Sequence, residues 1–360
     1  MQIGIIGLPN STKTTIFSAL TRETVQTQPF STGKFETRTA VVDVPDPRVD
    51  RLAAMFQPRK ITRAQVQYTD IAGLDSGVNR AGGFSGALLS AITVNDALLH
   101  VVRAFRDDTI PHIHGSVDAA RDLRDLDAEL LLADLGVVER RLERLENDLK
   151  RSGPGADVAR AEQKLLLRLK NALEVETPLR DLDLTEAEQQ SLRGFGFLSL
   201  KPVLVVLNVG DDGPLDATTV IPYSHRRSAL IALRGSIERE IAQMDEASAG
   251  LFLSEYGITE PSLRRLIRLS YDLLGLQSFF TVGPDEVRAW TMQRGGTAVD
   301  AAGAIHTDLA RGFIRAEVIG YDDLVQAGSL SVARQRGLLR LEGRDYVVND
   351  GDILEIRFNV

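Results

Sequence analysis

The sequence predicts an α/β protein with a helical hairpin inserted in its main domain and a small α+β module at its C-terminal end. Three observations support this fold class. Short β-type runs alternate with helical stretches over the first hundred residues, which is typical of a largely parallel sheet. An amphipathic helical pattern then interrupts the strands, which return near residue 201. After about residue 275 the chain changes to short strands separated by turns.

The strands expected in the main domain are short, apolar or β-branched runs. The first of them, Met1–Ile6, is followed by a tight loop and by a helix that includes Thr14–Leu20. The later strands are expected at Arg38–Val44, Ala64–Asp70, Ala97–Val102, Lys201–Asn208 and Ala229–Leu233. We therefore assign residues 1–120 and 200–274 to one domain.

The inserted hairpin is predicted from helical periodicity. From Leu123 onward, apolar residues recur every three or four positions with charged residues between them, which indicates a long amphipathic helix. The run Arg151–Gly155 (Arg-Ser-Gly-Pro-Gly) breaks the helix, and the same period then runs from Val158 to Leu173. Two such helices joined by a short turn form an antiparallel pair. We expect residues 121–199 to be an arm that either packs locally or projects toward a partner.

The last segment, residues 275–360, has the pattern of a small α+β domain. A turn is expected at Asn349–Asp352, where Asn-Asp-Gly-Asp breaks the chain direction. The strands are expected at Phe279–Val282, Arg315–Ile319, Asp345–Val348 and Ile353–Phe358.

Composition and charge exclude several classes of protein. The chain has 360 residues and no cysteine, which excludes disulfides, thiol nucleophiles and cysteine-ligated zinc. No leader segment and no apolar run of about 20 residues is present, so we expect a cytoplasmic protein without a membrane span. The net charge of −8 argues against coating nucleic acid through bulk charge, although a local basic patch for RNA remains open.

The most informative segment is Gly7–Thr15 (Gly-Leu-Pro-Asn-Ser-Thr-Lys-Thr-Thr), between a predicted strand and a predicted helix. It matches the phosphate-loop pattern at Gly7, Lys13 and Thr14, whereas Thr12 occupies the second glycine position. In such a loop, N–H groups at a helix N-terminus and the lysine bind phosphate oxygens, and the Thr14 hydroxyl ligates Mg²⁺. The alternative is a plain strand–turn–helix connection, because a left-handed conformation is costly for a β-branched residue such as Thr12.

Two further segments support a nucleotide site. Asp70-Ile-Ala-Gly73 follows a predicted strand, at the spacing where P-loop GTPases hold a Mg²⁺-associated aspartate and a glycine that senses the γ-phosphate. Asn208-Val-Gly-Asp211 follows a buried strand, where base-reading loops lie. We therefore expect Asp70 at the metal and Gly73 at the γ-phosphate, with Asn208 and Val209 at the base.

Taken together, these segments resemble the YchF family, the Obg-like ATPases within the Obg-related GTPases. The resemblance covers nearly the whole chain. It implies a P-loop NTPase domain and a C-terminal TGS domain, which has a ubiquitin-like β-grasp fold associated with RNA and ribosome contact. The matching runs include Gly7–Asn10, Val44–Arg48, Asp70–Leu74, His100–Phe105, Glu129–Asp134, Phe280–Gly283, Glu286–Trp290, Gly312–Glu317 and Gly351–Val360.

The resemblance also implies roles for individual residues. Mg²⁺ would be held by Thr14 and the switch residue Thr32, and a catalytic histidine is implied after His100–Phe105, where His112 stands. Leu74 occupies the position of the water-orienting glutamine of other GTPases. The residues implied to contact the nucleotide are Asn10, Ser11, Thr12, Lys13, Thr14, Thr15, Asn208, Val209, Asp211 and Ser236.

Two alternatives remain for His112-Ile-His114: a surface loop without chemistry, or a His-x-His metal pair. The metal pair is disfavoured because no carboxylate motif in the neighbouring sequence completes a site. The nucleotide is also open. Asp211 favours guanine, Val209 replaces the lysine that packs along a guanine base, and the resemblance favours ATP.

The resemblance implies an ATPase or GTPase that uses Mg²⁺ and contacts the ribosome or ribosomal RNA through the TGS domain and the arm. Asn10 also occurs in potassium-stimulated relatives of this superfamily, so K⁺ is a candidate second cofactor. Three departures from the family pattern lie on the phosphate side, at Ser11 and Thr12, at Gly33–Thr39 and at Asp75–Gly86. They predict slow hydrolysis or weak nucleotide binding, or alternatively a scaffold that keeps the fold without hydrolysis. A small-molecule enzyme on a Rossmann-like sheet is disfavoured, because no Gly-x-Gly-x-x-Gly follows the first strand.

Overall fold

The computed structural model describes residues 1–22, 37–71, 84–149, 156–255, 258 and 260–359. The contacts divide the chain into two compact units. The first consists of Met1–Ala40 and Gln67–Leu266, and the second of Val41–Val66 and Ile267–Val360. None of the helices in the described ranges is long and apolar enough to cross a membrane.

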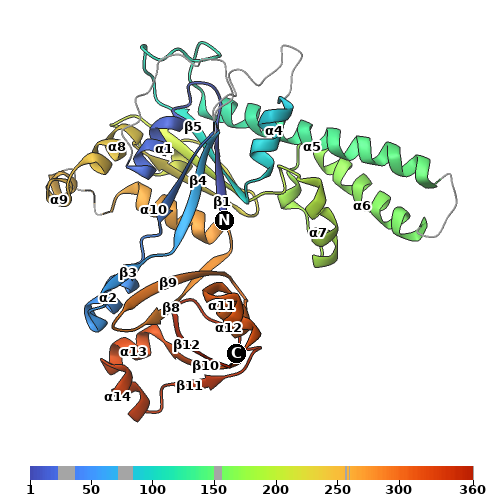
Figure 1. Ribbon diagram of the computed structural model, residues 1–360. Coiled ribbons are helices and arrows are strands. Elements are labelled where there is room, and N and C mark those ends of the chain that lie inside the picture. Colours follow the sequence, from blue (N-terminus) through green and yellow to red (C-terminus); the bar gives the residue numbers. More distant parts are fainter. Residues whose placement is uncertain (23–36, 72–83, 150–155, 256–257, 259, 360) are drawn as a thin grey trace. The chain divides into compact units, whose positions relative to one another are not determined.

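The first unit is built on a six-stranded sheet in the order β2-β4-β1-β5-β6-β7. Strands β4, β1, β5, β6 and β7 are all paired in parallel, as the alternating sequence predicted. The strands β5 and β6 are buried almost throughout, because helices cover both faces of the sheet (Figure 1). The strand bounds are β1 Gln2–Ile6, β2 Thr37–Asp43, β4 Gln65–Ile71, β5 Ala97–Ala104, β6 Val203–Val209 and β7 Ser228–Leu233.

Helices cover the two faces of this sheet in separate groups. Leu88 and Ile92 of α4 and Leu126 of α5 pack with β5 and β6 in one core cluster. Helices α1 and α8 pack against each other on the opposite face (Figure 1). The helices of this unit are α1 Lys13–Thr21, α4 Gly86–Thr93, α5 Ala119–Leu149, α6 Ala156–Glu174, α7 Glu186–Leu192, α8 Gly235–Gln243, α9 Glu246–Glu255 and α10 Ser262–Leu273, the last of which continues into the second unit. Short 3-10 turns lie at Leu179–Asp181, Arg193–Phe195 and Ala217–Thr219.

The helical arm is the pair α5 and α6, which run side by side (Figure 1). The apolar positions of the sequence pattern form its own core, with Val138 and Leu169 fully buried. Val158, where the second helix was expected to begin packing, is instead 73% exposed. Buried Asp134 holds the base of the arm, because its carboxylate accepts hydrogen bonds from the backbone N–H groups of Leu198 and Ser199 and from the Ser199 hydroxyl.

The second unit is built on a mixed sheet in the order β11-β10-β12-β8-β9-β3. Strands β12 and β8 are parallel, and each has an antiparallel neighbour on its other side, which is the β-grasp arrangement. Helix α11 buries Ala298, Ala301 and Ala302 in the core of this unit. The strands are β3 Lys60–Thr62, β8 Leu276–Val282, β9 Glu286–Gln293, β10 Phe313–Gly320, β11 Arg340–Glu342 and β12 Asp352–Phe358, and the helices are α2 Pro47–Phe56, α11 Ala298–Ile305, α12 Thr307–Arg311, α13 Tyr321–Ala327 and α14 Leu330–Gln335.

Residues 41–66 differ from the sequence-based assignment to domain 1–120, because their contacts place them in the second unit. Strand β3 pairs with β9, and the Arg48 guanidinium binds Asp46 and Asp350 at 2.8 Å each. The same guanidinium lies 5.1 Å from the centre of the Phe280 ring. A short ion-pair network therefore anchors a segment from early in the chain to the C-terminal sheet.

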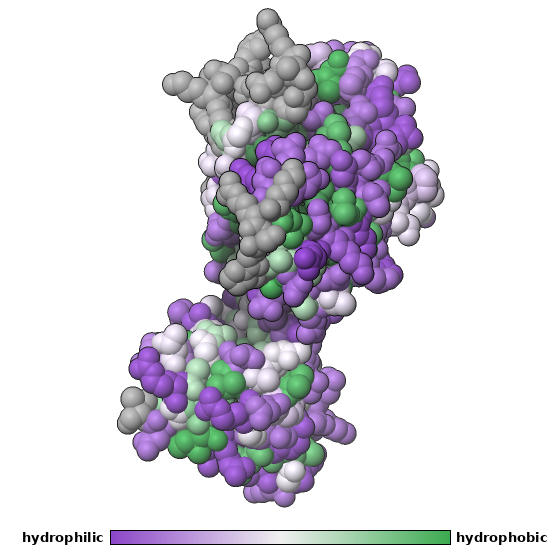
Figure 2. Space-filling model, turned by 90° about the vertical axis from the view of Figure 1, so that its right-hand side faces the viewer, coloured by the Kyte–Doolittle hydropathy of each residue, from purple (hydrophilic) through white to green (hydrophobic). Residues whose placement is uncertain are grey.

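One predicted strand is wrong. Residues 345–348 do not form a strand, and only Val347 makes an isolated bridge, to Thr297. The Asp352 carboxylate accepts hydrogen bonds from the Asn349 N–H and the Tyr346 hydroxyl, at 2.9 and 2.8 Å, which turns the chain here. Strands β3, β9 and β11 were not predicted. On the face shown in Figure 2, the described surface is largely hydrophilic with scattered apolar residues.

Candidate functional site

The predicted phosphate loop connects β1 to α1 and is tightly constrained. A Cβ on Gly7 would lie 2.4 Å from the Val101 carbonyl oxygen, so any side chain at this position would collide with the backbone of β5. The Lys13 ammonium donates to the carbonyl oxygens of Gly7 and Leu8, at 2.9 and 3.0 Å. The lysine therefore lies along its own loop, in reach of the region where the pattern places phosphate oxygens.

Thr12 adopts the left-handed conformation that the phosphate-loop pattern requires at this position and that is costly for a β-branched residue. Its φ of 70° and ψ of 26° are left-handed, and its side chain makes no capping hydrogen bond to α1. Holding a β-branched residue there costs about 1–3 kcal/mol. The Thr12 hydroxyl makes two other hydrogen bonds. Its Oγ1 donates to the Ser11 carbonyl oxygen and accepts a 2.6 Å hydrogen bond from Asn208 Nδ2. These two contacts fix the left-handed residue.

Asn208 joins the phosphate loop to the start of α8. Its Oδ1 accepts a 2.8 Å hydrogen bond from the Gly235 N–H, while its Nδ2 is bound to Thr12. The Ser236 hydroxyl donates to the Asp211 carboxylate, so these residues meet at the carboxyl edge of β6 and β7. Val209 is buried in the core cluster of the sheet, which does not favour the predicted contact of this residue with a base.

Thr14 and Asp70 lie together at the place predicted for the metal. The Thr14 hydroxyl donates to Asp70 Oδ2 over 3.3 Å, and Asp70 Oδ1 is buried without a hydrogen-bond partner among the described residues. Burial raises the pKa of Asp70, and the Lys13 ammonium and the Thr14 hydroxyl partly offset that rise. An orphaned carboxylate oxygen beside a hydroxyl is a donor set that suits Mg²⁺. Thr32, Gly73 and Leu74, and most of the two altered segments Gly33–Thr39 and Asp75–Gly86, lie outside the described residues.

The loop between β5 and α5 brings His112 to this region. Asn10 Nδ2 donates to the Pro111 carbonyl oxygen at 2.9 Å, which ties this loop to the phosphate loop. Buried Arg103 secures it from beneath, through hydrogen bonds to the carbonyl oxygens of Phe105, Asp107 and Ile110. His112 is therefore held by the fold, not placed on a free surface loop.

His112 has a partner that the sequence did not reveal. Its Nε2 lies 2.8 Å from Asp122 Oδ2, and its Nδ1 accepts a 3.2 Å hydrogen bond from the His114 N–H. Because Nδ1 accepts, Nε2 carries the proton of the neutral ring and donates to Asp122. The predicted helix began at Leu123, whereas α5 begins at Ala119, so Asp122 belongs to its first turn.

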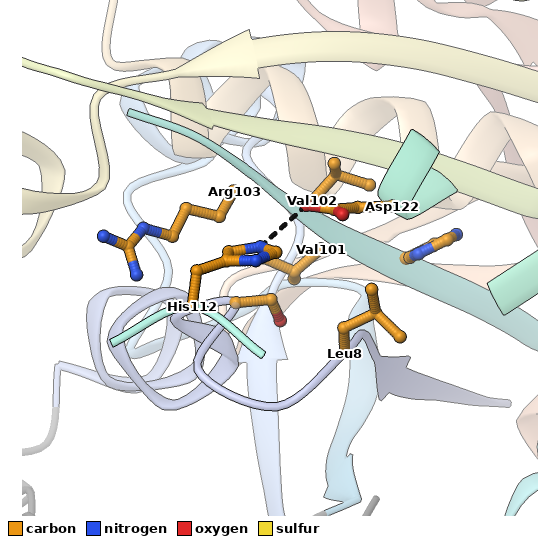
Figure 3. A pocket seen from close by; sticks show the side chains of 8 residues that line it. Leu8, Val101, Val102, Arg103, His112 and Asp122 are labelled. Carbon is orange, nitrogen blue, oxygen red and sulfur yellow. Dashed lines mark hydrogen bonds and ion pairs between the residues drawn. The ribbon is translucent and has the colours of Figure 1, made fainter. Parts of the chain in front are cut away.

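A pocket brings residues of the phosphate loop and the histidine loop together. Figure 3 shows His112 between Arg103 and Leu8, with the dashed contact to Asp122. Ser11 and His100 also line this pocket. Ser11 Oγ and His100 Nδ1 are buried and have no hydrogen-bond partner in the described part of the chain. Burial, with the positive charges of Lys13 and Arg180, lowers the pKa of His100 to about 3, so this imidazole is neutral.

Family models match both ends of the chain. Residues 2–137 match a model described as a 50S ribosome-binding GTPase. Residues 276–359 match the model of the YchF GTPase C-terminal domain, which is described as a protein of unknown function.

Whole proteins match over the full length as well. The chain is 41% identical to the ribosome-binding ATPase YchF of Pasteurella multocida and 39% identical to that of Bacillus subtilis, in each case over 100% of this chain and at least 99% of the relative. It is 36% identical to Obg-like ATPase 1 of Oryza sativa, over 100% of this chain and 92% of the relative. The solved structure of the Schizosaccharomyces pombe YchF GTPase matches with a TM-score of 0.86 and 30% identity, over 99% of this chain and 97% of that one. Sequence, fold and comparisons agree, and the chain belongs to the YchF family of P-loop proteins.

Proposed function

We propose that this protein binds a nucleoside triphosphate, with a preference for ATP, and hydrolyses it slowly with Mg²⁺. The observation that carries the proposal is the convergence of Lys13, Thr14 and Asp70 at the N-terminus of α1, where one carboxylate oxygen of Asp70 has no hydrogen-bond partner among the described residues. A hydrogen-bond acceptor buried in this way is costly unless a ligand or ion completes its contacts. The names of the relatives support the same activity, since they are called ATPases and a GTPase.

Phosphoryl transfer to water needs positive charge and N–H donors around the β- and γ-phosphates. The backbone N–H groups of Asn10–Thr15 would supply the donors, and Lys13 would exchange its two carbonyl contacts for phosphate oxygens. Thr14 and Asp70, with Thr32, would hold Mg²⁺, which neutralises charge on the phosphates when bound. The Gly73 N–H would contact the γ-phosphate. Ordering of the segments around Thr32 and Gly73 would act as a nucleotide switch.

The water-orienting residue proposed here is His112. The glutamine position of other GTPases is occupied by Leu74, which has no polar group. His112 lines the same pocket as Leu8 and Ser11 of the phosphate loop, and Asp122 fixes its orientation. Both ring nitrogens are engaged here, by Asp122 and by the His114 N–H, so His112 would have to release one of these contacts to position water.

The preference for ATP rests on the base-reading edge. Val209 stands where a lysine would pack along guanine, and the Asp211 carboxylate is already bound by the Ser236 hydroxyl.

A second cofactor, K⁺, would be bound by the side-chain oxygen of Asn10, whose Nδ2 donates to the Pro111 carbonyl oxygen. We also propose ribosome association through the C-terminal domain and the arm, and hence a cytoplasmic location, because several relatives are named ribosome-binding ATPases.

The test is turnover of ATP and GTP with Mg²⁺ by the wild type and by Lys13→Ala. We expect the variant to be slower by about 100-fold or more, because a preorganised charge at the phosphates is lost. Lys164→Ala, which removes an exposed lysine of α6, is the matched control and should keep wild-type turnover. Equal turnover by wild type and Lys13→Ala would instead support the alternative of a scaffold without hydrolysis, an alternative that the left-handed Thr12 favours.

A further inference from the structure

A cluster of metal-ligating side chains lies beside the site of the proposed ATPase but shares none of its Mg²⁺ ligands. His114 comes from the loop before α5, and Asp122 and Asp125 come from the first turns of α5. One ligand atom from each of these three residues lies within 4.8 Å of the other two. The sequence argued against a His-x-His metal site because no carboxylate motif accompanied it, and the fold supplies the two carboxylates.

The spacing suits a small divalent ion. Asp122 and Asp125 are three positions apart, so both side chains lie on one face of the helix. His114 Nε2 is 3.1 Å from an oxygen of Asp125. Two such ligands bound to one ion at about 2.0–2.2 Å would lie roughly 3.3 Å apart, so His114 and Asp125 need only a small shift. The Asp122 oxygen lies within 4.8 Å of both and would close in on the ion.

The surroundings already orient the buried ligand. The Asp122 side chain is 5% exposed, and its Oδ1 accepts hydrogen bonds from Arg121 Nε and Nη2 at 3.0 and 2.8 Å. Its Oδ2 accepts from His112, so a second layer of hydrogen bonds fixes the carboxylate as such layers do at metal sites. His114 and Asp125 are 39% and 43% exposed, which gives an ion a path from solvent.

We propose that His114, Asp122 and Asp125 bind a divalent transition-metal ion of the Zn²⁺ type, with water in the remaining positions. One imidazole nitrogen with two carboxylates favours such an ion over Mg²⁺, which prefers oxygen ligands alone. The two carboxylates bring negative charge that attracts a cation, and of these two only Asp122 is paired with Arg121. The site is separate from Thr14 and Asp70, where the proposed function places Mg²⁺.

Occupancy would also affect the histidine loop. The ion would join His114 of this loop to α5, and it would share Asp122 with His112. The loop would then be held in the position in which His112 donates to Asp122. This consequence rests on the proposed function: if His112 must move to orient water, bound Zn²⁺ slows hydrolysis of ATP.

The first experiment measures binding alone. Zn²⁺ is titrated into nucleotide-free, full-length protein by calorimetry in the presence of excess Mg²⁺, and Co²⁺ replaces it for visible absorption spectroscopy. We expect one tight site in the wild type, and loss of that site in His114→Ala and in Asp125→Asn. His306→Ala is the matched control, because His306 is another exposed histidine beside an aspartate, with its Nδ1 3.5 Å from Asp308. Asp70→Asn should also keep the Zn²⁺ site.

The outcomes separate this inference from the proposed function. Absence of tight binding in the wild type, or equal binding by His114→Ala, overturns the metal site, whatever the ATPase measurements show. His112→Leu, which has no donor, should weaken Zn²⁺ by about 10–100-fold if the hydrogen bond to Asp122 supports the ligand, and unchanged affinity would remove that part of the argument. In turnover assays, Zn²⁺ should slow the wild type and leave His114→Ala unaffected. If Zn²⁺ binds as expected while no variant hydrolyses nucleotide, the metal site stands and the ATPase proposal fails.

Discussion

Replacing Thr12 with glycine tests the most unusual feature of the phosphate loop. In the structure Thr12 is left-handed and its hydroxyl accepts a hydrogen bond from Asn208 Nδ2. Glycine adopts this conformation without strain and cannot hold Asn208. If the loop must release Asn208 to close on a nucleotide, the wild type loses that hydrogen bond on binding and Thr12→Gly does not.

The expected magnitude follows from the two effects. A net hydrogen bond contributes about 0.5–1.5 kcal/mol, and about 1.4 kcal/mol corresponds to a tenfold change in affinity. Thr12→Gly should therefore bind nucleotide roughly two- to tenfold more tightly. Global stability should change little, because relief of left-handed strain is offset by the lost hydrogen bond and by the greater freedom of glycine in the unfolded chain.

Calorimetry with a non-hydrolysable ATP analogue and Mg²⁺ measures the affinity, and urea unfolding measures the stability. Thr12→Ala separates the causes, since it removes the hydroxyl but keeps a Cβ in the left-handed conformation. It should gain affinity like Thr12→Gly if the bond to Asn208 is the handicap, and remain like wild type if the Cβ is. Equal or weaker binding by Thr12→Gly would refute the reasoning.

Two further predictions concern buried groups around the loop. Gly7→Ala should lower the free energy of unfolding by about 1–3 kcal/mol in urea titrations, because its Cβ would meet the Val101 carbonyl oxygen at 2.4 Å. The control is Gly86→Ala, which should not be destabilised because no atom lies within 4 Å of the new Cβ. Equal effects of the two substitutions would contradict the packing argument. The second prediction concerns His100, whose pKa is lowered from 6.5 to about 3 in the folded protein. As the pH falls, the unfolded chain therefore binds the proton first. The free energy of unfolding is unaffected by this group above pH 6.5 and decreases between pH 6.5 and about 3. By pH 5 the free energy of unfolding should have fallen by about 2 kcal/mol through this group, and His100→Leu should lack this decrease. If the free energy of unfolding, measured with urea, depends on pH in the same way in both proteins, the assignment is refuted.

Much of the architecture follows from local sequence signals. The parallel sheet, the two arm helices and the position of the phosphate loop depend on periodicity and on residues close together in the chain, such as Gly7, Lys13 and Thr14. The boundaries of the helices follow less directly from the apolar period. Helix α5 begins four residues earlier than predicted, at Ala119 and not Leu123, because its first turn, Ala-Ala-Arg-Asp, has no large apolar residue to extend the apolar period.

Strand β3 was missed for a physical reason. Strand β3 has three residues and becomes a strand only because it pairs with β9, more than two hundred positions later in the chain. The turn at 345–348 was mistaken for a strand because its β-type residues are held by Asp352, a partner that periodicity does not include.

The sequence by itself predicted the candidate groups for phosphate and magnesium, because a short loop before a helix carries the lysine, the hydroxyl and the N–H groups. Only the tertiary structure decided how those groups are restrained. Thr12 is held by Asn208 across 196 positions, and Asp122 meets His112 through the start of a different element. Such pairs depend on the packing of strands and helices against one another, and their energy comes from burial and hydrogen bonding between residues that are remote in the chain.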